Sequence, residues 1–423
     1  MARYEIPLGS GYGDTSVPRA REVFGSINAM TAQIYADAQG ARRYVSNTYG
    51  NDAEDGKTWF TAKATVDAAI ASLPNRTVNS VPNVPYGEIV ISQGDHTLSS
   101  IVNYCSGFVI TGMGVGTGTT GSRIIASGSH PGHMFNSVTG GSDNHGALFQ
   151  DVILKGHKPA QPSAAYDIMT ANGGFNTLLR NVVFQEASRW ALQIKGGLMN
   201  YMAIGLSFAE CGSSSQGGAI WMNGISGGSQ ITFINGQVDD CGVIPILIQS
   251  DESGKGKCVN IFDYKVEGAL HLTHNTHAIQ YIPNSAGGDP VMINIDGLYV
   301  NNFSSGWSLG MFGGAVHQAG GTGPTAIWKL GRIYPDGQYL KAFEDDKNSG
   351  NDSVGGQMIR GSYRGSEFPT IPHFEFAGVG IYAGAVSPPT MSAPNGSIYY
   401  SSVGAGTTDN VYVRRGGAWV GVH

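Results

Sequence analysis

Apolar and polar residues alternate in short runs along residues 148–300, and these runs recur at a nearly regular interval. Runs of this kind lie at 204–208, 261–266 and 293–300. Alternation with a period of two predicts β-strands that bury one face. Strands and turns repeated in this way, with almost no helical pattern, predict stacked coils. The stretch is therefore expected to form an all-β fold, a right-handed parallel β-helix, with loops of unequal length leaving the turns.

One apolar position can be followed through successive copies at intervals of about 24 to 34 residues: Leu154, Phe184, Phe208, Val238, Val266 and Val300. Two residues further on, the side chains are mostly polar and are expected to stand on a turn: Glu186, Glu210, Asp240, Gly268 and Asn302. Three residues further on, they are small or apolar and are expected to point inward: Ala187, Cys211, Cys241, Ala269 and Phe303. Because parallel strands lie about 4.8 Å apart, equivalent residues should stack as ladders.

A second strand follows the turn in most copies. Its inward residues are expected to be Leu192, Ile194, Ile220, Met222, Ile246, Ile248, Leu270 and Leu272. Its outward residues then form a column of Gln193, Trp221, Leu247 and His271. The pattern thus predicts which side chains fill the core and which lie on the outside of the coils.

The two ends of the chain differ from this repeat. Residues 1–45 form a Gly/Pro-rich arm with a helical stripe of Val23, Ile27, Met30 and Ile34, too short to bury that stripe alone. We expect it to pack against other copies or another protein. Residues 61–73 predict a short helix that Pro74 and Asn75 end. The predicted modules are an attachment arm (1–45), a β-helix body with its cap and a strand-and-loop extension (46–385), and a C-terminal β-module (386–423).

Composition agrees with an all-β protein that has many tight turns. Glycine accounts for 63 of 423 residues, about 15% against a usual share of about 7%. Charged residues make up only 13%, while 41% of the chain is hydrophobic and periodic, which argues against disorder. The net charge of −6 argues against nucleic acid as the main partner.

The cysteines and the apolar stretches bear on whether the chain is a zinc-binding, disulfide-bonded, secreted or membrane protein. Cys105, Cys211, Cys241 and Cys258 form no CxxC pair, so a zinc site is not expected. Cys211 and Cys241 are expected to fill the core as reduced thiols, and a bridge between them is not implied. The N-terminus has no signal-peptide core and no stretch approaches a membrane span, so we expect a protein made in the cytoplasm without membrane insertion.

Three phrases resemble the N-terminal cap and first coils of pectin-lyase-like β-helix proteins. They are YGNDAEDGKTWFTAKATVDAAIASLP, GEIVISQGDHTLSS and FVITGMGVGTGTTGSRIIAS, with an acidic DG turn, a helix ending near Ala-Ile and an Ile-x-Gly-x-Gly turn. The resemblance covers about 48–127 by motif and 148–300 by repeat. It implies the fold and says little about chemistry.

The C-terminal phrase VSPPTMSAPNGSIYYSSVGAGTTDNVYVRRGGAWVGVH is similar to the terminal β-module of phage tail fibres. Together with the arm and the repeat, this resemblance implies a phage tail fibre or tailspike protein. Such proteins are usually homotrimers of the virion, made in the host cytoplasm, that bind a bacterial surface polysaccharide. The arm would then attach to a phage tail or baseplate protein.

Catalysis, if present, is expected at the stacked carboxylates Glu186, Glu210 and Asp240. Adjacent rungs separate equivalent backbones by about 5 Å and alternate rungs by about 10 Å. Retaining glycosidases need carboxyls about 5–5.5 Å apart and inverting ones about 6.5–9.5 Å, so a ladder can supply either geometry. Asp239 and Glu267 lie one residue before the ladder position in their copies and could join the stacked carboxylates. The alternatives are solvated or backbone-capping turn residues, or a calcium site made by the same oxygens.

Sugar binding is expected on the outward column, with Trp221 as a stacking platform and Gln193 and His271 beside it. The alternative for Trp221 is a position under a loop or in a subunit interface. No metal or other cofactor is expected, because His271, His274 and His277 diverge along a strand and turn. The Gly-rich stretch at 112–116 lacks the helix of a nucleotide loop.

Three functions stay open at this point. The first is a tail fibre or tailspike that binds a surface glycan. The second is a glycoside hydrolase that acts through the carboxylate ladder, favoured over a lyase because no Asp cluster with a nearby Arg matches the lyase scheme. The third is a purely structural tail component.

Overall fold

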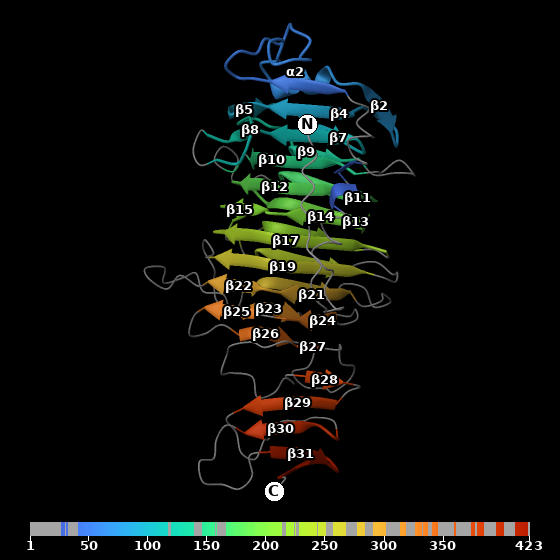
Figure 1. Ribbon diagram of the computed structural model, residues 1–423, viewed down its shortest axis with the longest axis vertical. Helices are drawn as coiled ribbons and strands as arrows, with labels where there is room; N and C mark the ends of the chain where they lie inside the picture. The colour runs from blue at the N-terminus through green and yellow to red at the C-terminus, as the bar shows by residue number, and fades with distance from the viewer. Residues whose placement is uncertain are drawn as a thin grey trace, which may run out of the picture.

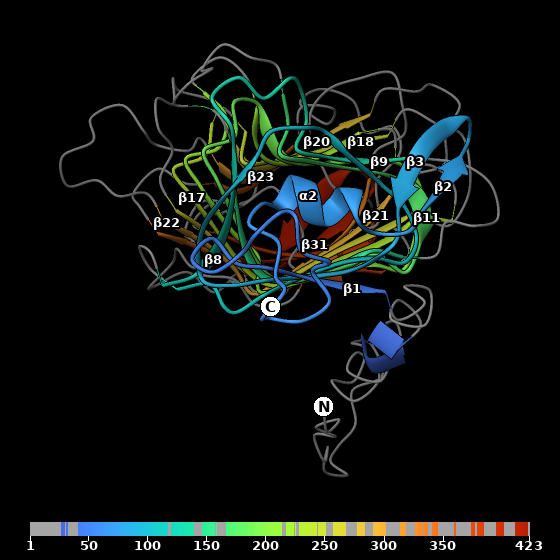
Figure 2. The ribbon, with the colours of Figure 1, turned by 90° about the horizontal axis from the view of Figure 1, so that it is seen from above.

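Stacked coils of parallel strands form the body of the molecule, shown along its length in Figure 1 and from one end in Figure 2. The computed structural model describes residues 27–29 and 31–32, most of 41–301, and then 314–318, 326–331, 333–336, 341–345, 359–360, 374–376, 379–384, 395–401 and 411–421. The residues between 41 and 301 that it does not describe include 139–145, 161–165, 251–256, 268–276 and 284–290. The predicted all-β parallel β-helix is confirmed, since each coil adds one rung to two long parallel sheets.

The first of these sheets, called sheet 1, has 16 strands. Its main path runs through β1 (Arg42–Val45), β4 (Gly87–Ile91), β7 (Phe108–Gly112), β10 (Leu148–Lys155), β12 (Leu178–Gln185), β14 (Tyr201–Ile204), β17 (Gln230–Asp239), β19 (Cys258–Glu267), β21 (Met292–Asp296), β24 (Ile327–Leu330) and β27 (Ile359–Arg360). Beside this path lie β5 (Gly94–Leu98), β8 (Ser122–Ala126), β15 (Ser207–Ala209), β22 (Leu298–Asn301) and β25 (Ile333–Asp336).

The second sheet, called sheet 2, has nine strands and closes the other side of the coils. In chain order these are β6 (Val102–Tyr104), β9 (Phe135–Ser137), β11 (Met169–Phe175), β13 (Trp190–Met199), β16 (Gly218–Asn223), β18 (Ile246–Ser250), β20 (His277–Pro283), β23 (Gly314–Gln318) and β26 (Lys341–Asp345). The strands from β23 onward extend the coils through part of the region that gave no sequence motif.

The predicted register of sheet 1 is confirmed at each of its steps. Leu154 pairs with Phe184, and the series continues through Phe208, Val238, Val266 and Val300. These six side chains are fully buried in the main core. The Phe184 and Phe208 rings stack with centroids 5.1 Å apart and planes 7° from parallel, as one rung on the next.

The core lies between the two sheets and continues along the stack. The predicted inward residues of sheet 2 that the structure describes are all buried in it: Leu192, Ile194, Ile220, Met222, Ile246 and Ile248. Ala187, Cys211 and Cys241 are buried as predicted, and both cysteines are free thiols. Four inward predictions, Ala269, Leu270, Leu272 and Phe303, lie outside the described residues.

A left-handed backbone position bends each long strand of sheet 1 at the same place. The residues there have φ between 51° and 75°: Asp151, Asn181, Gly205, Asn235, Asp263 and Gly297. Glycine has no Cβ to clash in this conformation, and Asn and Asp tolerate it better than other residues. The Asn181 amide also donates to the Asp151 carboxylate of the previous rung, at 2.9 Å. Residue type at one position per coil therefore sets the bend.

A short helix, α2 (Val66–Ala71), covers the N-terminal end of the core, near the middle of the view in Figure 2. It is shorter than the predicted 61–73. Thr65 caps it, accepting the Ala68 amide at 3.1 Å. The Asp52 carboxylate of the acidic turn accepts the Ala64 and Thr65 amides at 2.8 and 2.9 Å. Buried Val66 and Ala69 complete the cover. Beside it lies an antiparallel pair, β2 (Asn75–Val78) and β3 (Val81–Pro85).

The C-terminal part forms a separate sheet of five strands. These are β28 (Phe374–Phe376), β29 (Val379–Gly384), β30 (Ile398–Ser401), β31 (Val411–Arg415) and β32 (Ala418–Gly421). Tyr399, Tyr412 and Trp419 make its small core. Two of the five strands precede residue 386, where the predicted terminal module begins. No helix among the described residues is long and apolar enough to cross a membrane.

The arm contacts the outside of the chain's own sheet 1. Residues 27–29 and 31–32 are helical, and Ile27 is only 7% exposed. It packs on Val109, Leu148 and Leu178, which are fully buried although they face away from the main core. One residue of the apolar stripe, Ile27, thus covers the chain's own coils. The other three, Val23, Met30 and Ile34, lie outside the described residues, and the expected contact of the arm with another copy or protein stays a prediction.

An Ile27→Asp substitution is expected to release the arm, because a carboxylate cannot be buried against three apolar side chains without a large desolvation cost. Burial of an isoleucine side chain contributes about 1.5–3 kcal/mol, so arm opening should rise at least about tenfold. Hydrogen exchange should show lost protection in residues 27–32 and an unchanged core. Asn28→Asp, on the exposed side of the same helix, is the matched control. Equal protection in both variants would contradict the contact.

Candidate functional site

Carboxylates gather on one edge of the β-helix, where strands of sheet 1 end and the turn to sheet 2 begins. Glu186, Glu210 and Asp240 follow β12, β15 and β17 directly. Their amides donate to carbonyls of the next rung, at 3.0 Å to Ala209, 3.2 Å to Asp239 and 3.2 Å to Glu267. The three residues therefore stand on consecutive turns, as the register predicts. We call Glu186, Glu210, Asp239, Asp240 and Glu267 the acidic edge.

The three turn residues of this edge have left-handed backbones, with φ of 54° at Glu186, 56° at Glu210 and 47° at Asp240. This conformation costs an ordinary L-residue about 1–2 kcal/mol. The bend in sheet 1 uses Asn, Asp or Gly for the same conformation, whereas this edge uses glutamate twice. Strain held at carboxylates is the kind of outlier from which a functional hypothesis can start.

The partners of these carboxylates differ along the edge. Lys155 Nζ lies 2.8 Å from Glu186 Oε1, and Glu186 Oε2 is buried without a hydrogen-bond partner among the described residues. Glu210 is exposed, and its carbonyl accepts Lys158 Nζ at 2.7 Å. Glu186 is thus held by a lysine, and its carboxylate is less available to a ligand than that of Glu210.

Asp239 and Glu267 form a pair on adjacent rungs of β17 and β19. Lys265 Nζ lies 2.5 Å from Glu267 Oε1, and Gln237 donates to Glu267 Oε2 at 3.3 Å. Burial raises the pKa of the Asp239 carboxyl, and the nearby carboxylates of Asp240 and Glu267 raise it further. One acid therefore keeps its proton to higher pH, beside another that an ammonium group holds. Rungs about 4.8 Å apart are close to the carboxyl separation of retaining glycosidases, about 5–5.5 Å.

Metal binding at the acidic edge has no support from side-chain geometry. Among the residues that the structure describes, no group of three His, Cys, Asp or Glu side chains is placed to hold a metal ion. The chemistry that the edge can perform on its own is proton transfer and nucleophilic attack by carboxylates.

The predicted outward column of sheet 2 is correct through three rungs and wrong at the fourth. Gln193 pairs with Trp221, and Trp221 with Leu247. The next residue is Gln280, not His271. His271 lies outside the described residues, and the strand that pairs with β18 is β20, which begins at His277. The alternation of only two apolar residues, Leu270 and Leu272, did not show where this strand begins.

The environment of Trp221 combines features of a platform and of a packed residue. The side chain is half-buried, and its indole N–H donates to Gln249 at 2.6 Å. The Trp190 ring lies 5.7 Å away at 31°, and the Arg189 guanidinium lies 5.7 Å from the Trp221 ring centroid. Gln193 and Leu247 are only 1% and 8% exposed, although they face away from the core. Of Gln193, Trp221 and Leu247, Trp221 is therefore the residue placed to meet a ligand.

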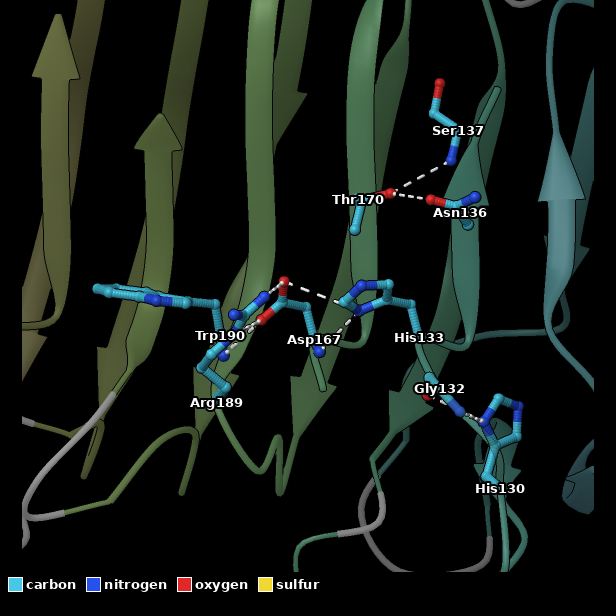
Figure 3. A network of polar contacts seen from close by, with 9 residues as sticks. All are labelled: His130, Gly132, His133, Asn136, Ser137, Asp167, Thr170, Arg189 and Trp190. Carbon is cyan, nitrogen blue, oxygen red and sulfur yellow. Dashed lines mark hydrogen bonds and ion pairs between the residues drawn. The ribbon is translucent and has the colours of Figure 1, made fainter. Parts of the chain in front are cut away.

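A polar network that the sequence analysis missed lies at the start of sheet 2, shown in Figure 3. Asp167 is fully buried, and Arg189 donates to both of its carboxylate oxygens, from Nε at 2.7 Å and Nη2 at 2.6 Å. The Trp190 amide adds a third hydrogen bond at 3.1 Å. Such a fork satisfies the hydrogen bonds of a buried carboxylate, and the hydrogen bonds from Arg189 to Asp167 raise the pKa of Arg189, so its guanidinium stays charged.

His133 completes this network from the previous rung. Its Nδ1 accepts the Asp167 amide at 3.0 Å and lies 3.8 Å from Asp167 Oδ2. Burial lowers the pKa of His133, and the cations Arg189 and Lys195 also lower it, against the opposing effect of Asp167. The imidazole is therefore neutral at pH 7.

The repeat could have indicated this network, because its members occupy the starts of three consecutive strands. Phe135 pairs with Met169, and Met169 with Leu192, so His133, Asp167 and Trp190 are aligned two residues earlier. These members precede or begin their strands, whereas the predicted outward column holds only residues within the strands.

Comparison with known proteins gives only distant similarity. No family model matches the chain, and no curated protein matches it. A solved structure described as Geobacillus virus E2 ORF18 is 13% identical over 97% of this chain and 70% of its own, with a TM-score of 0.45. The catalytic domain of a GH87 alpha-1,3-glucanase in complex with tetrasaccharides is 11% identical over 70% of this chain and 66% of its own, with a TM-score of 0.26. Both scores are below 0.5, so neither carries an argument about this chain.

The raised pKa of Asp239 gives a testable dependence of stability on pH. A carboxyl whose folded pKa exceeds its unfolded value adds stability below the unfolded pKa of about 3.9 and loses it as pH rises through the folded pKa. Asp239→Asn should therefore raise the thermal unfolding midpoint at pH 7 and leave it almost unchanged at pH 3. Asp263→Asn, an exposed residue of β19, is the control for one lost carboxylate. A lower midpoint for Asp239→Asn at pH 7 would contradict the shift.

Proposed function

We propose that this chain is a phage tail fibre or tailspike protein that binds a bacterial surface glycan on the outer face of sheet 2. The observation that carries the proposal is the half-buried indole of Trp221, whose N–H donates to Gln249 and whose ring lies beside Trp190 and Arg189. A ring that is already held in place loses little conformational entropy when a ligand stacks on it. Aromatic side chains are also enriched at recognition surfaces.

The surroundings of Trp221 support a carbohydrate more than a protein ligand. Amide and hydroxyl side chains share the outer face of sheet 2 with it, including Asn136, Thr170, Gln249 and Gln280. Side chains of this kind donate and accept hydrogen bonds, as sugar hydroxyls do. Stacked rungs also present the same face repeatedly along the coil axis, which suits a polymer.

The order of modules supports the fibre part of the proposal. An arm whose described residues 27–29 and 31–32 are helical precedes a long stack of coils and a terminal five-stranded sheet. In this proposal the protein is a homotrimer of the virion, and the arm joins it to a phage tail or baseplate protein. Because Ile27 packs on sheet 1, the arm already contacts its own chain before it binds such a partner.

Trp221→Ala should weaken binding to the surface polysaccharide at least about tenfold, since stacking contributes on the order of 1.4 kcal/mol or more. Retention of purified protein on polysaccharides extracted from a panel of bacteria, followed by titration, measures this. Trp59→Ala, a partly exposed tryptophan in the N-terminal cap, is the matched control. Unchanged binding by Trp221→Ala would remove the platform, and a monomeric mass in the same sample would remove the trimer. Retention of no polysaccharide would favour the purely structural tail component.

A second candidate, glycoside hydrolysis at the acidic edge, is favoured by the Asp239 and Glu267 pair. Asp239 would protonate the glycosidic oxygen, and Glu267 would act as the nucleophile or stabilising carboxylate. Burial is the main cause of the raised pKa of Asp239, and the nearby carboxylates of Asp240, Glu267 and Glu210 add to it. In this scheme Glu186, which Lys155 holds, positions the turn.

Hydrolysis should appear as new reducing ends without unsaturated products. Asp239→Asn and Glu267→Gln should each lower the rate at least about a hundredfold, the usual contribution of general acid–base catalysis. Glu186→Gln should keep most of the activity, whereas Glu210→Gln and Asp240→Asn test the ladder itself. Double-bond absorbance would indicate a lyase and a different site. Full activity in all five variants would exclude the acidic edge.

A further inference from the structure

We propose that His133, Arg189 and Trp221 form a binding site for an anionic group of the glycan, such as a carboxylate, sulfate or phosphate, with Lys195 as a second cation on the same face. This inference rests on the proposed function and adds to it the chemical class of the ligand. It starts from the polar network of Figure 3 and from the hydrogen-bonding atoms that this network leaves unused.

Asp167 positions the arginine without meeting the ligand itself. It is fully buried and engages Nε and Nη2 of Arg189 together, so the guanidinium plane has one orientation. Nη1 has no hydrogen-bond partner among the residues that the structure describes. The Arg189 side chain remains 24% exposed. The charged fork thus leaves N–H donors for an acceptor from solution.

His133 offers a donor of the same kind. Because its Nδ1 accepts the Asp167 amide, the neutral ring carries its proton on Nε2. Its side chain is 29% exposed, and Nε2 has no partner among the described residues. An imidazole fixed in this tautomer donates a hydrogen bond and accepts none with its free nitrogen.

Lys195 adds charge to the same surface. It lies on the outer face of β13, two residues beyond Gln193, and pairs in register with Asn172 and Asn223. It is exposed, and within the described part of the chain it forms no hydrogen bond or ion pair. Arg189 and Lys195 together outweigh the single charge of Asp167.

The polar atoms of Arg189, His133 and Lys195 that have no partner among the described residues are all N–H donors. A ligand group that only accepts hydrogen bonds and carries negative charge matches them better than a hydroxyl, which must also place its own hydrogen. The Arg189 guanidinium lies 5.7 Å from the Trp221 ring centroid. A sugar stacked beside that ring could therefore bring an attached anionic group to Arg189 and His133.

The test uses the full chain and each surface polysaccharide that it retains. Every such polymer is compared before and after chemical reduction of its carboxyl groups, and before and after removal of sulfate and phosphate. One of these treatments should weaken binding at least about tenfold, the effect expected for charge-assisted hydrogen bonds. Which treatment does so identifies the anionic group. The difference should shrink in 0.5 M salt, because salt screens exposed charges.

Variants separate the site from a merely structural network. His133→Asn keeps an acceptor for the Asp167 amide but removes the outward donor, and Lys195→Gln removes the second cation. Each should lose about threefold to tenfold affinity for the untreated polymer and none for the treated one. Lys57→Gln, an exposed lysine of the cap, is the control. Arg189→Ala is avoided because it would leave Asp167 charged and buried without its partner.

The outcomes distinguish this inference from the function on which it rests. Retention of treated and untreated polymers with equal affinity would overturn the anionic site and leave glycan binding in place. An equal loss of affinity for both polymers in His133→Asn and Lys195→Gln would also overturn it, since the residues would then be structural. Failure of the protein to retain any polysaccharide would overturn both.

Discussion

The hydrogen-bonded stacking of one coil on the next is the interaction on which the rest of this molecule depends. Parallel strands place equivalent residues about 4.8 Å apart, so each position becomes a column along the axis. A column has to be filled consistently. Phe184 and Phe208 stack inside the coils, while Asn181 and Asp151 bond to each other at the bend. In this fold the residue type at one position therefore also determines a contact between coils that are far apart in the sequence.

Columns also explain why charge gathers where it does. An acidic residue on a turn meets the turn residues above and below it, and the left-handed backbone of Glu186, Glu210 and Asp240 holds them there. Lys155 and Lys265 compensate part of this charge from neighbouring positions. Burial raises the pKa of Asp239, and the nearby carboxylates of Asp240 and Glu267 raise it further. Stacking thus gives chemically similar carboxyl side chains different partners and different environments.

The two candidate regions follow from one connection. In the coil of β12 and β13, the turn runs from Glu186 to Arg189, so the acidic edge and the Asp167 network lie at the two ends of a four-residue link. One end carries the carboxylates of the acidic edge, and the other carries the partly exposed N–H donors of Arg189 and His133. A polymer lying along this side of the coils would meet recognition groups and acidic groups together, which is the reason to consider binding and hydrolysis as related functions.

Much of the fold could be predicted because its signal is periodic. Alternation and recurrence alone indicated the register from Leu154 to Val300 and the inward residues of sheet 2, since each depends only on positions within strands. The prediction failed at His271, whose expected place in the outward column Gln280 occupies, because two alternating apolar residues did not show where that strand begins. The packing of the arm on another copy or protein stays a prediction, and the sequence did not indicate that Ile27 covers an apolar strip on the outside of sheet 1. Amphipathic patterns show that a face needs a cover and not which surface supplies it.

The sequence by itself determined the all-β stack, its register and the stacking of three acidic turns, because these follow from the order of apolar and polar residues. Only the tertiary structure decided which carboxylates form an ion pair with a lysine and which carboxyl has a raised pKa. It also decided that Arg189 binds Asp167 beside His133. Those properties depend on burial and on side-chain distances between coils. The sequence pattern places residues in the same column. The side-chain partners and the burial that affect the ionisation of those residues exist only once the coils are folded together.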